Sequence, residues 1–554
     1  MGNGKERLKI GYLTMQLLRC LAAALALSFG TATAHQGVFP EDVRAVADRI
    51  TAARLAKDLE FLASDALRGR NTPSPGFDRA ADFIAKRLEQ AGVKPLGDDG
   101  TYLQRYEMQE SHVDTAETFL EVGGRRFAFG DDLVIRSFAR PLSGPVAAVY
   151  AGHGWTVPGE GIDPYAGVDV EGKLVIAHGP RALPRGVEIR QIGRITPGAS
   201  SVVTEAARRG AAGVILVPQD SALADWERMR GQNLTRRELV PGVPSAYAAP
   251  PSTAVLVSRA AAEAIFEGER VAGADLLARE EARDYPDSFQ LTKTVTLQVT
   301  AKTTVHRPYN VVGLVEGSDP VLKHQYITVA SHLDGAVGTR AVDGDEIYNS
   351  ADDNASGSAA GLAIAELMPR ARPKRSLIFI WDSGEERGLW GTRHFIGNPP
   401  VPLDRIVAHV NIDMIGATKA PGSPDADAAR VAGPNEVYLI GPGVLSATVD
   451  ALLDRVNRAY VNMTFKRDWD TPDSEFFYPR TDAGPFLERG VLTIGFTTGI
   501  HDRYHLPADE AKALDPKKME SVARTAFASL WALADAAERP RIDKAIPATV
   551  PRYR

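Results

Sequence analysis

Short apolar runs recur through the C-terminal half of the chain. They occupy residues 295–299, 310–315, 327–331, 376–381, 406–412 and 493–497. Runs of this length bounded by turn residues predict buried strands. A longer apolar stretch at 359–368 has the spacing of a helix. Strands and helices in this order predict an α/β domain over 292–539, with a mixed central sheet flanked by helices.

The first half of the chain has two different patterns. Residues 52–92 carry apolar side chains at helical spacing, and we expect residues 41–143 to be the N-terminal part of the same domain. Between 144 and 287 the sequence becomes rich in glycine, with apolar runs at 146–150, 172–176 and 213–217 and a helical segment at 201–209. These features predict an inserted β-rich domain.

Metal-ligand side chains accompany the predicted strands of the C-terminal half. Because the carboxyl ends of parallel strands meet at one edge of a sheet, we expect these side chains to lie close together. They are His332, Asp352, Glu386, Asp413 and His505. Two imidazoles and three carboxylates suit zinc and leave room for a water molecule. The sequence therefore predicts two zinc ions per chain, about 3.5 to 4 Å apart.

The local context supports several of these positions. His332 is followed two residues later by Asp334, whose carboxylate can orient the imidazole. Asp413 ends an apolar run, where an unpaired charge would cost several kcal/mol. Glu385 and Glu386 follow the run 376–381, so a solvated helix face does not explain the pair.

These segments resemble one known family. They are His332-Leu-Asp334, Ser350-Ala-Asp-Asp-Asn-Ala-Ser-Gly357, Gly384-Glu-Glu-Arg-Gly-Leu-Trp-Gly391, Asn411-Ile-Asp-Met-Ile-Gly416 and Tyr504-His-Leu-Pro-Ala-Asp509. The chain is similar to the co-catalytic zinc aminopeptidases of the bacterial leucyl aminopeptidase type, which are related to glutamate carboxypeptidase and the transferrin receptor. The resemblance implies the zinc exopeptidase fold and an enzyme that acts on peptides.

The resemblance also implies individual roles. Asp352 would bridge the metals, with a cis peptide bond between it and Asp353. His332 and Asp413 would complete one metal site, and Glu386 and His505 the other. Glu385 would be the general base, which takes a proton from water and passes it to the leaving amine.

Two further positions belong to the expected site, and one position departs from the family pattern. Tyr504 matches a position that hydrogen-bonds the oxyanion, although an aromatic loop anchor is an equally good interpretation. Arg480 matches a substrate-binding arginine of some relatives. The chain departs from the family pattern at Ala483, where a histidine is common.

Other residues and other enzyme classes compete with this assignment. His394 and His409 have the contexts of structural histidines, and His501 lacks the motif around His505. The segment Gly357-Ser-Ala-Ala-Gly361 is spaced wrongly for a serine-hydrolase elbow. No His-Glu-x-x-His motif occurs, which excludes a single-helix zinc protease.

The N-terminal segment predicts export. Residues 1–34 combine basic residues with an apolar stretch and end in a small-residue cleavage site, as a secretory signal peptide does. Its removal takes away four basic residues and Glu6, so the formal charge changes from -6 to -9 and the only cysteine, Cys20, is lost. No later segment has the length of a membrane span, so no membrane anchor is expected. An acidic surface argues against nucleic acid as a partner. We expect a periplasmic or extracellular protein.

The inserted region resembles a protease-associated domain, through residues 163–173 and 210–215. Residues 540–554 mix proline and arginine without periodicity and predict a flexible tail. The function expected from the sequence is a zinc aminopeptidase with peptide substrates. A carboxypeptidase of the same superfamily, a one-zinc glutaminyl cyclase and a non-catalytic, receptor-like binding module remain as alternatives.

Overall fold

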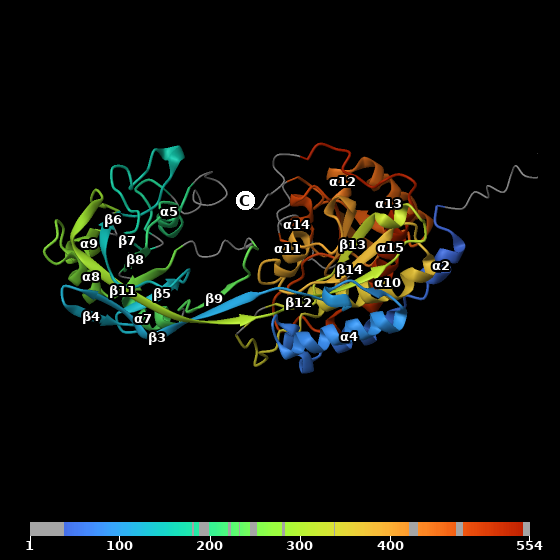
Figure 1. Cartoon of the computed structure of the whole chain (residues 1–554), viewed down its shortest axis with the longest axis horizontal. Helices are drawn as coiled ribbons and strands as arrows, with labels where there is room; N and C mark the ends of the chain where they lie inside the picture. The colour runs from blue at the N-terminus through green and yellow to red at the C-terminus, as the bar shows by residue number, and fades with distance from the viewer. Residues whose placement is uncertain are drawn as a thin grey trace, which may run out of the picture. The chain divides into compact units, whose positions relative to one another are not determined.

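The computed structural model describes residues 38–179, 182–187, 199–219, 223–231, 233–243, 252–279, 283–336, 338, 340–419, 430–472 and 480–546. The expected signal peptide lies outside these residues. The chain divides into two compact units (Figure 1). One contains Met1–Gln104, Asn310–Glu386 and Asn398–Arg554, and the other contains Arg105–Tyr309 and Arg387–Gly397. Within the described residues, no helix combines the length and the hydropathy that crossing a membrane requires.

The first unit is built on a mixed sheet, as the pattern of apolar runs predicts. Its strand order is β1-β12-β14-β13-β15-β18-β16-β17, with β2 paired to β12. The strands β14, β13, β15 and β18 at the centre are parallel to one another. Their bounds are β1 (Lys94–Pro95), β2 (Leu103–Arg105), β12 (Tyr309–Val315), β13 (Tyr326–Ala330), β14 (Ser376–Trp381), β15 (Ile406–Ile412), β16 (Glu436–Ile440), β17 (Thr464–Lys466) and β18 (Leu492–Thr497).

Helices cover this sheet. The helix α10 packs on β14 and β15 and also contacts α2, α3, α4 and α15, whereas α14 packs on β15 and β18. The start of α4 follows from its sequence, because the Ser74 hydroxyl caps the backbone and Pro75 occupies the first turn. The bounds are α2 (Glu41–Ala47), α3 (Ala52–Leu62), α4 (Pro75–Ala91), α10 (Gly357–Ala371), α12 (Pro442–Leu445), α13 (Ala447–Ala459), α14 (Ala483–Glu488) and α15 (Pro516–Asp535).

The second unit is also built on a mixed sheet, in the order β4-β3-β11-β6-β7-β8-β10-β5, with β9 paired to β3. The strands β6, β7, β8 and β10 are parallel. The bounds are β3 (Met108–Val122), β4 (Arg125–Ala128), β5 (Leu133–Ser137), β6 (Pro145–Tyr150), β7 (Leu174–His178), β8 (Gly213–Val217), β9 (Arg236–Leu239), β10 (Ala254–Val257), β11 (Phe289–His306), α5 (Val202–Arg208), α7 (Trp226–Gly231), α8 (Arg259–Phe266), α9 (Gly273–Arg279) and α11 (Trp390–Gly397).

The second unit is wider than the 144–287 insertion expected from the sequence. Residues 105–143, expected in the peptidase part, belong to it, and so does the run 295–299, which lies inside β11. The reason is long-range pairing, because β11 is hydrogen-bonded to β3 along most of its length and to β6 on its other side. A change of local composition at 144 does not reveal that pairing.

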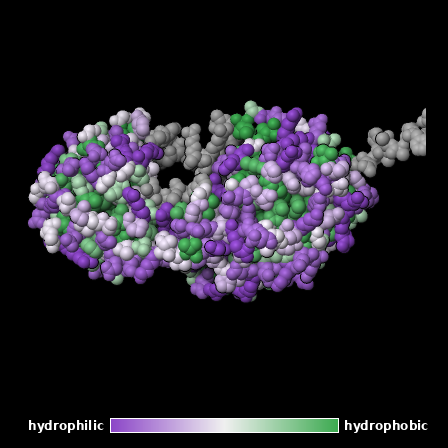
Figure 2. All heavy atoms as spheres, viewed as in Figure 1, coloured by the Kyte–Doolittle hydropathy of each residue, from purple (hydrophilic) through white to green (hydrophobic). Residues whose placement is uncertain are grey.

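On the face drawn in Figure 2, hydrophilic residues predominate and apolar residues form small islands.

Residues 540–546, expected to be flexible, include Asp543. Its carboxylate accepts hydrogen bonds from the backbone N–H groups of Ala447 and Thr448 and from the Ser446 hydroxyl. This carboxylate caps the start of α13. Residues 547–554 lie outside the described part.

Candidate metal centre

The residues with metal-ligand side chains gather at the carboxyl edge of the parallel strands. His332 lies two residues after β13 and Asp413 directly follows β15. Glu386 comes from the loop after β14, and His505 from the loop after β18. The fifth candidate ligand is an aspartate of the helical turn Ala351–Ser356, which precedes α10. This edge is where open α/β sheets bind ligands.

Two groups of three side chains form there and share one carboxylate. The first comprises His332, Asp353 and Asp413, and the second comprises Asp353, Glu386 and His505. The His332 Nε2 atom lies 3.1 Å from Asp353 Oδ1 and 3.5 Å from Asp413 Oδ1. The His505 Nε2 atom lies 3.1 Å from Asp353 Oδ2 and 3.0 Å from Glu386 Oε2. The two oxygens of Asp353 therefore face different histidines.

The expected bridging residue, Asp352, does not occupy the shared position. Its carboxylate accepts hydrogen bonds from the backbone N–H groups of Gly416 at 2.7 Å and Ala417 at 3.2 Å. Because neighbouring side chains in this turn point in different directions, Asp353 faces the histidines and Asp352 faces the backbone after β15. The cis peptide bond is likewise one residue later than expected, between Asp353 and Asn354.

The donor set fits divalent zinc. Within the described residues, Glu386 Oε1 is buried and has no hydrogen-bond partner. A buried carboxylate oxygen without a partner is costly unless a cation or water binds it. Each group offers one imidazole nitrogen and two carboxylates, and coordinated zinc accepts both types of ligand. The residues therefore fit a pair of metal ions joined through Asp353.

The electrostatics of the centre reflect buried charge. Burial raises the pKa of Glu385 well above its usual range and that of Glu386 to about 7. Burial opposes the charge of His505, but hydrogen bonds to the carboxylates of Asp353 and Glu386 outweigh it and raise the pKa to about 10. The same competition, with Asp413 as the main carboxylate, raises the pKa of His332.

The expected base and its supporting residue lie beside the first group. The Glu385 backbone N–H donates a hydrogen bond to Asp334 Oδ1 at 3.2 Å. The His332 Nδ1 atom lies 3.1 Å from the backbone carbonyl oxygen of Asp334, and 3.9 Å from its carboxylate. The Asp334 carbonyl therefore orients the imidazole, and the carboxylate mainly orients the Glu385 loop.

Tyr504 and Arg480 are also placed by the structure. The Tyr504 ring stacks on the imidazole of His505, with centroids 3.8 Å apart. Burial raises the pKa of the Tyr504 hydroxyl, as do the nearby carboxylates, whereas Arg480 lowers it. Arg480 is exposed, and Ala483 begins the buried helix α14.

A second layer of polar side chains lies behind the ligands, and the sequence analysis did not identify it. The Asp509 carboxylate accepts hydrogen bonds from the backbone N–H groups of Asp352 and Asp353, at 3.0 and 3.1 Å. His501 Nε2 lies 3.2 Å from Asp352 Oδ2. Asp509 ends the motif that contains His505, which was the available signal.

The two competing histidines, His409 and His394, make structural contacts. His409 is buried, stacks on Phe486 with centroids 3.8 Å apart, and forms a 3.0 Å hydrogen bond with the Thr328 hydroxyl. Burial lowers its pKa to about 3. His394 packs beside the Tyr106 ring.

One segment of the sequence matches the sequence model of a known family. Residues 310–530 match the sequence model of Peptidase family M28. An aminopeptidase of Pseudomonas aeruginosa is 30% identical over 192 residues, which are 34% of this chain and 31% of that relative. A probable zinc metalloprotease of Leptosphaeria maculans is 25% identical over 264 residues, which are 42% of this chain and 58% of that relative.

These matches are partial. The chain spans about a third of the length of the Pseudomonas relative and somewhat over half of the Leptosphaeria relative. Among solved structures, an aminopeptidase from Aneurinibacillus sp. strain AM-1 has a TM-score of 0.50 at 17% identity, covering 92% of this chain and 100% of that chain. That likeness shows a shared fold, which extends beyond residues 310–530.

Proposed function

We propose that this chain is an exported, zinc-dependent aminopeptidase that removes N-terminal residues from peptides. The observation that carries the proposal is the shared carboxylate of Asp353, which joins two groups of zinc-type ligands beside Glu385. Relatives described as an aminopeptidase and a probable zinc metalloprotease support the reaction class. Two zinc ions per chain are part of the proposal.

The segment 310–530 would supply the groups that peptide hydrolysis needs. Zinc bound by these ligands would polarise the scissile carbonyl and lower the pKa of a water molecule. Glu385 would take the proton from that water and deliver it to the leaving amine. The hydrogen bond from the Glu385 N–H to Asp334 holds the base in its loop.

The peptide itself would be held by neighbouring residues. The raised pKa keeps the Tyr504 hydroxyl protonated at neutral pH, so it can donate a hydrogen bond to the developing oxyanion. Arg480 would contact the substrate from the exposed side. The acidic cluster of the metal centre, which includes Glu385 and Asp413, would attract the free α-amino group of the substrate.

The direction of cleavage separates this proposal from the carboxypeptidase alternative. A panel of aminoacyl anilides, together with peptides acetylated at the N-terminus or amidated at the C-terminus, tests it. We expect zinc-dependent release from anilides and no cleavage of acetylated peptides. Cleavage of N-blocked peptides from the C-terminus would favour the carboxypeptidase. No cleavage at either end together with no bound zinc would favour the binding module, and full activity with one zinc would favour the cyclase-like mechanism.

A further inference from the structure

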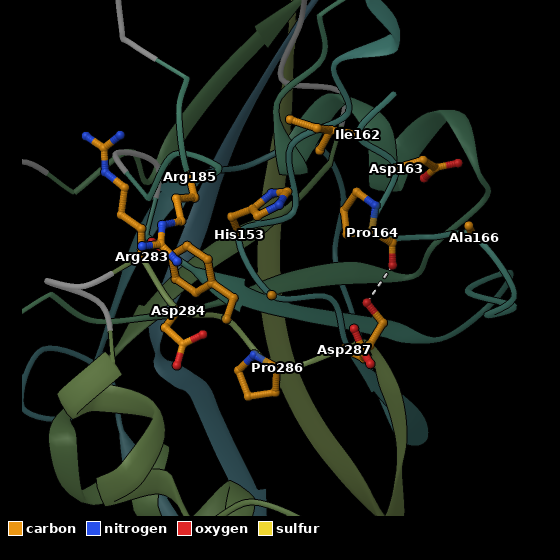
Figure 3. Close-up of a pocket in the computed structure, with 13 residues that line it drawn as sticks. His153, Ile162, Asp163, Pro164, Ala166, Arg185, Arg283, Asp284, Pro286 and Asp287 are labelled. Atoms are coloured by element: carbon orange, nitrogen blue, oxygen red, sulfur yellow. Dashed lines mark hydrogen bonds between the residues drawn. The ribbon is translucent and has the colours of Figure 1, made fainter. Parts of the chain in front are cut away.

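A pocket of about 450 Å³ lies in the second unit, and the proposed reaction does not use it (Figure 3). Gly152 and His153 line it two and three residues after the end of β6, and Arg185 lines it from the segment after β7. Because β6 and β7 are parallel, both segments leave the sheet at the same edge. A carboxyl edge of parallel strands is a common ligand site, and the volume is within the usual range for small-molecule pockets.

Two guanidinium groups line one side of this pocket. Figure 3 shows Arg185 and Arg283 on the same side, with Asp163 on the opposite side. Arg185 has no hydrogen-bond or ion-pair partner among the described residues, and Arg283 donates a hydrogen bond to the Val187 carbonyl at 3.0 Å. Within the described part of the chain neither is paired with a carboxylate. A guanidinium presents several N–H donors in a plane that matches a carboxylate.

The groups between the two sides are neutral or apolar. His153 Nδ1 accepts a hydrogen bond from the Trp155 backbone N–H at 3.0 Å, so its Nε2 carries the proton and can donate. Burial lowers the pKa of His153 to about 4, and the ring is therefore neutral at pH 7. The Tyr285 ring lies edge-on to it, with centroids 5.6 Å apart. Ile162 and two prolines add apolar surface.

Carboxylates also line the pocket and restrict its ligand. They belong to Asp163, Asp284 and Asp287. The Asp163 carboxylate is paired with Arg209 at 3.0 Å, whereas Asp284 and Asp287 are exposed. Three acidic groups beside two arginines disfavour a ligand with several negative charges, such as a phosphate ester. A single carboxylate attached to an apolar group suits the pocket better.

We propose that this pocket binds the free α-carboxylate of an amino acid or of a peptide C-terminus. Arg185 and Arg283 bind the carboxylate, and the apolar side chain next to it packs on Tyr285 and Ile162. All the lining residues belong to the second unit, so the proposal does not depend on the metal centre.

Ligand-observed NMR on the full chain tests this inference with three organic probes and with inorganic phosphate. Acetyl-leucine carries the carboxylate and acetyl-leucinamide does not, whereas the peptide acetyl-Ala-Ala-Leu distinguishes a peptide C-terminus from an amino acid. We expect acetyl-leucine to bind and the amide to bind at least ten-fold more weakly. Arg185→Gln and Arg283→Gln should each weaken acetyl-leucine binding at least ten-fold. Arg208→Gln, an exposed arginine outside the pocket, should leave it unchanged.

Several results would overturn the assignment. Equal binding of the acid and the amide would show that the carboxylate is not recognised. Unchanged affinity in both pocket variants would place the binding elsewhere, the metal centre included. Binding of inorganic phosphate as tight as that of acetyl-leucine would exclude the proposed ligand class. Among the described residues Arg185 has no hydrogen-bond or ion-pair partner, so Arg185→Gln breaks no contact within the protein. That variant therefore tests the proposal even if Arg283→Gln unfolds.

Discussion

Replacing Arg70 by methionine tests how the loops of the metal centre are held in place. Arg70 is fully buried. Its guanidinium donates hydrogen bonds to the backbone carbonyls of Leu333 at 2.9 Å, Asn349 at 2.9 Å and Ser350 at 3.0 Å, and to that of Leu62. Leu333 follows a ligand histidine directly, and Ser350 lies three residues before Asp353. One side chain therefore joins two ligand-bearing loops to the N-terminal helices.

The size of the expected effect follows from these contacts. Methionine fills similar space but donates no hydrogen bond, so four buried carbonyls lose a donor. Each buried group left unsatisfied costs about 1 to 3 kcal/mol. Water can recover part of this, and we expect the free energy of unfolding to fall by about 4 kcal/mol, near the lower end of the sum. Arg70 also lies close enough to Asp334, Asp509 and Asp353 to interact with their charges, so its loss increases repulsion among the carboxylates.

Two measurements check this prediction. Chemical denaturation compares the stability of the variant and the native chain, and competition with a chelator compares their zinc affinities. We expect zinc affinity to fall by about 10- to 100-fold, as for other changes to residues that orient metal ligands. Arg68→Met is a matched control, because Arg68 is exposed in the same turn. If Arg70→Met is as stable as Arg68→Met and binds zinc equally well, the proposed role of Arg70 is refuted.

Three further predictions concern the ligands, the base and pH. Asp353→Asn should lower the zinc content below one ion per chain, as metal analysis would show. Asp352→Asn should keep zinc and lower the free energy of unfolding by about 1 to 3 kcal/mol, because the Asp352 oxygens accept hydrogen bonds from backbone N–H groups. If instead Asp352→Asn loses zinc and Asp353→Asn keeps it, Asp352 is the bridging residue. Glu385→Gln should retain zinc and lower kcat by about 10² to 10⁴-fold in the anilide assay, and unchanged turnover would assign the base elsewhere. Because Glu386 and His505 have raised pKa values of about 7 and about 10 without metal, zinc must displace their protons. Zinc affinity measured by chelator competition should therefore fall from pH 8 to pH 6, by about ten-fold per pH unit for each proton displaced, and a flat profile would contradict this account.

The sequence predicted the central sheet because buried parallel strands have a strong local pattern. The runs at 327–331, 376–381, 406–412 and 493–497 correspond to β13, β14, β15 and β18 within one or two residues. Four of the five expected ligands follow the carboxyl ends of these strands in the sequence, and this predicted that they lie at one edge of the sheet. Periodicity gave no basis for choosing between Asp352 and Asp353, because the turn at 351–356 is neither a regular strand nor a regular helix.

The second layer and the domain boundaries depend on contacts that no local pattern encodes. Arg70 binds carbonyl groups that lie 263 to 280 residues away in the sequence. Its motif, Leu67-Arg-Gly-Arg70, indicates a turn, and the structure adds that Gly69 has a φ of 76° and lies against Tyr348. The boundary at Arg105 likewise follows from the pairing of β3 with β11. The sequence can therefore indicate a turn such as the one that carries Arg70, but it does not reveal which distant carbonyl groups that side chain binds.

Contacts within the protein, and not only the metal, fix the positions of the candidate ligands. The Nε2 atoms of His332 and His505 lie 3.1 and 3.0 Å from carboxylate oxygens, so the imidazoles and carboxylates of the centre face one another. Protons can offset part of the negative charge, but they do not fix the direction of the carboxylates. That direction comes from the backbone around Asp353, which Asp509 and Arg70 hold through the N–H and carbonyl groups of residues 349–353. A chain with the same five ligands but without this buried layer would bind zinc more weakly, because ordering the loops would then cost part of the binding energy.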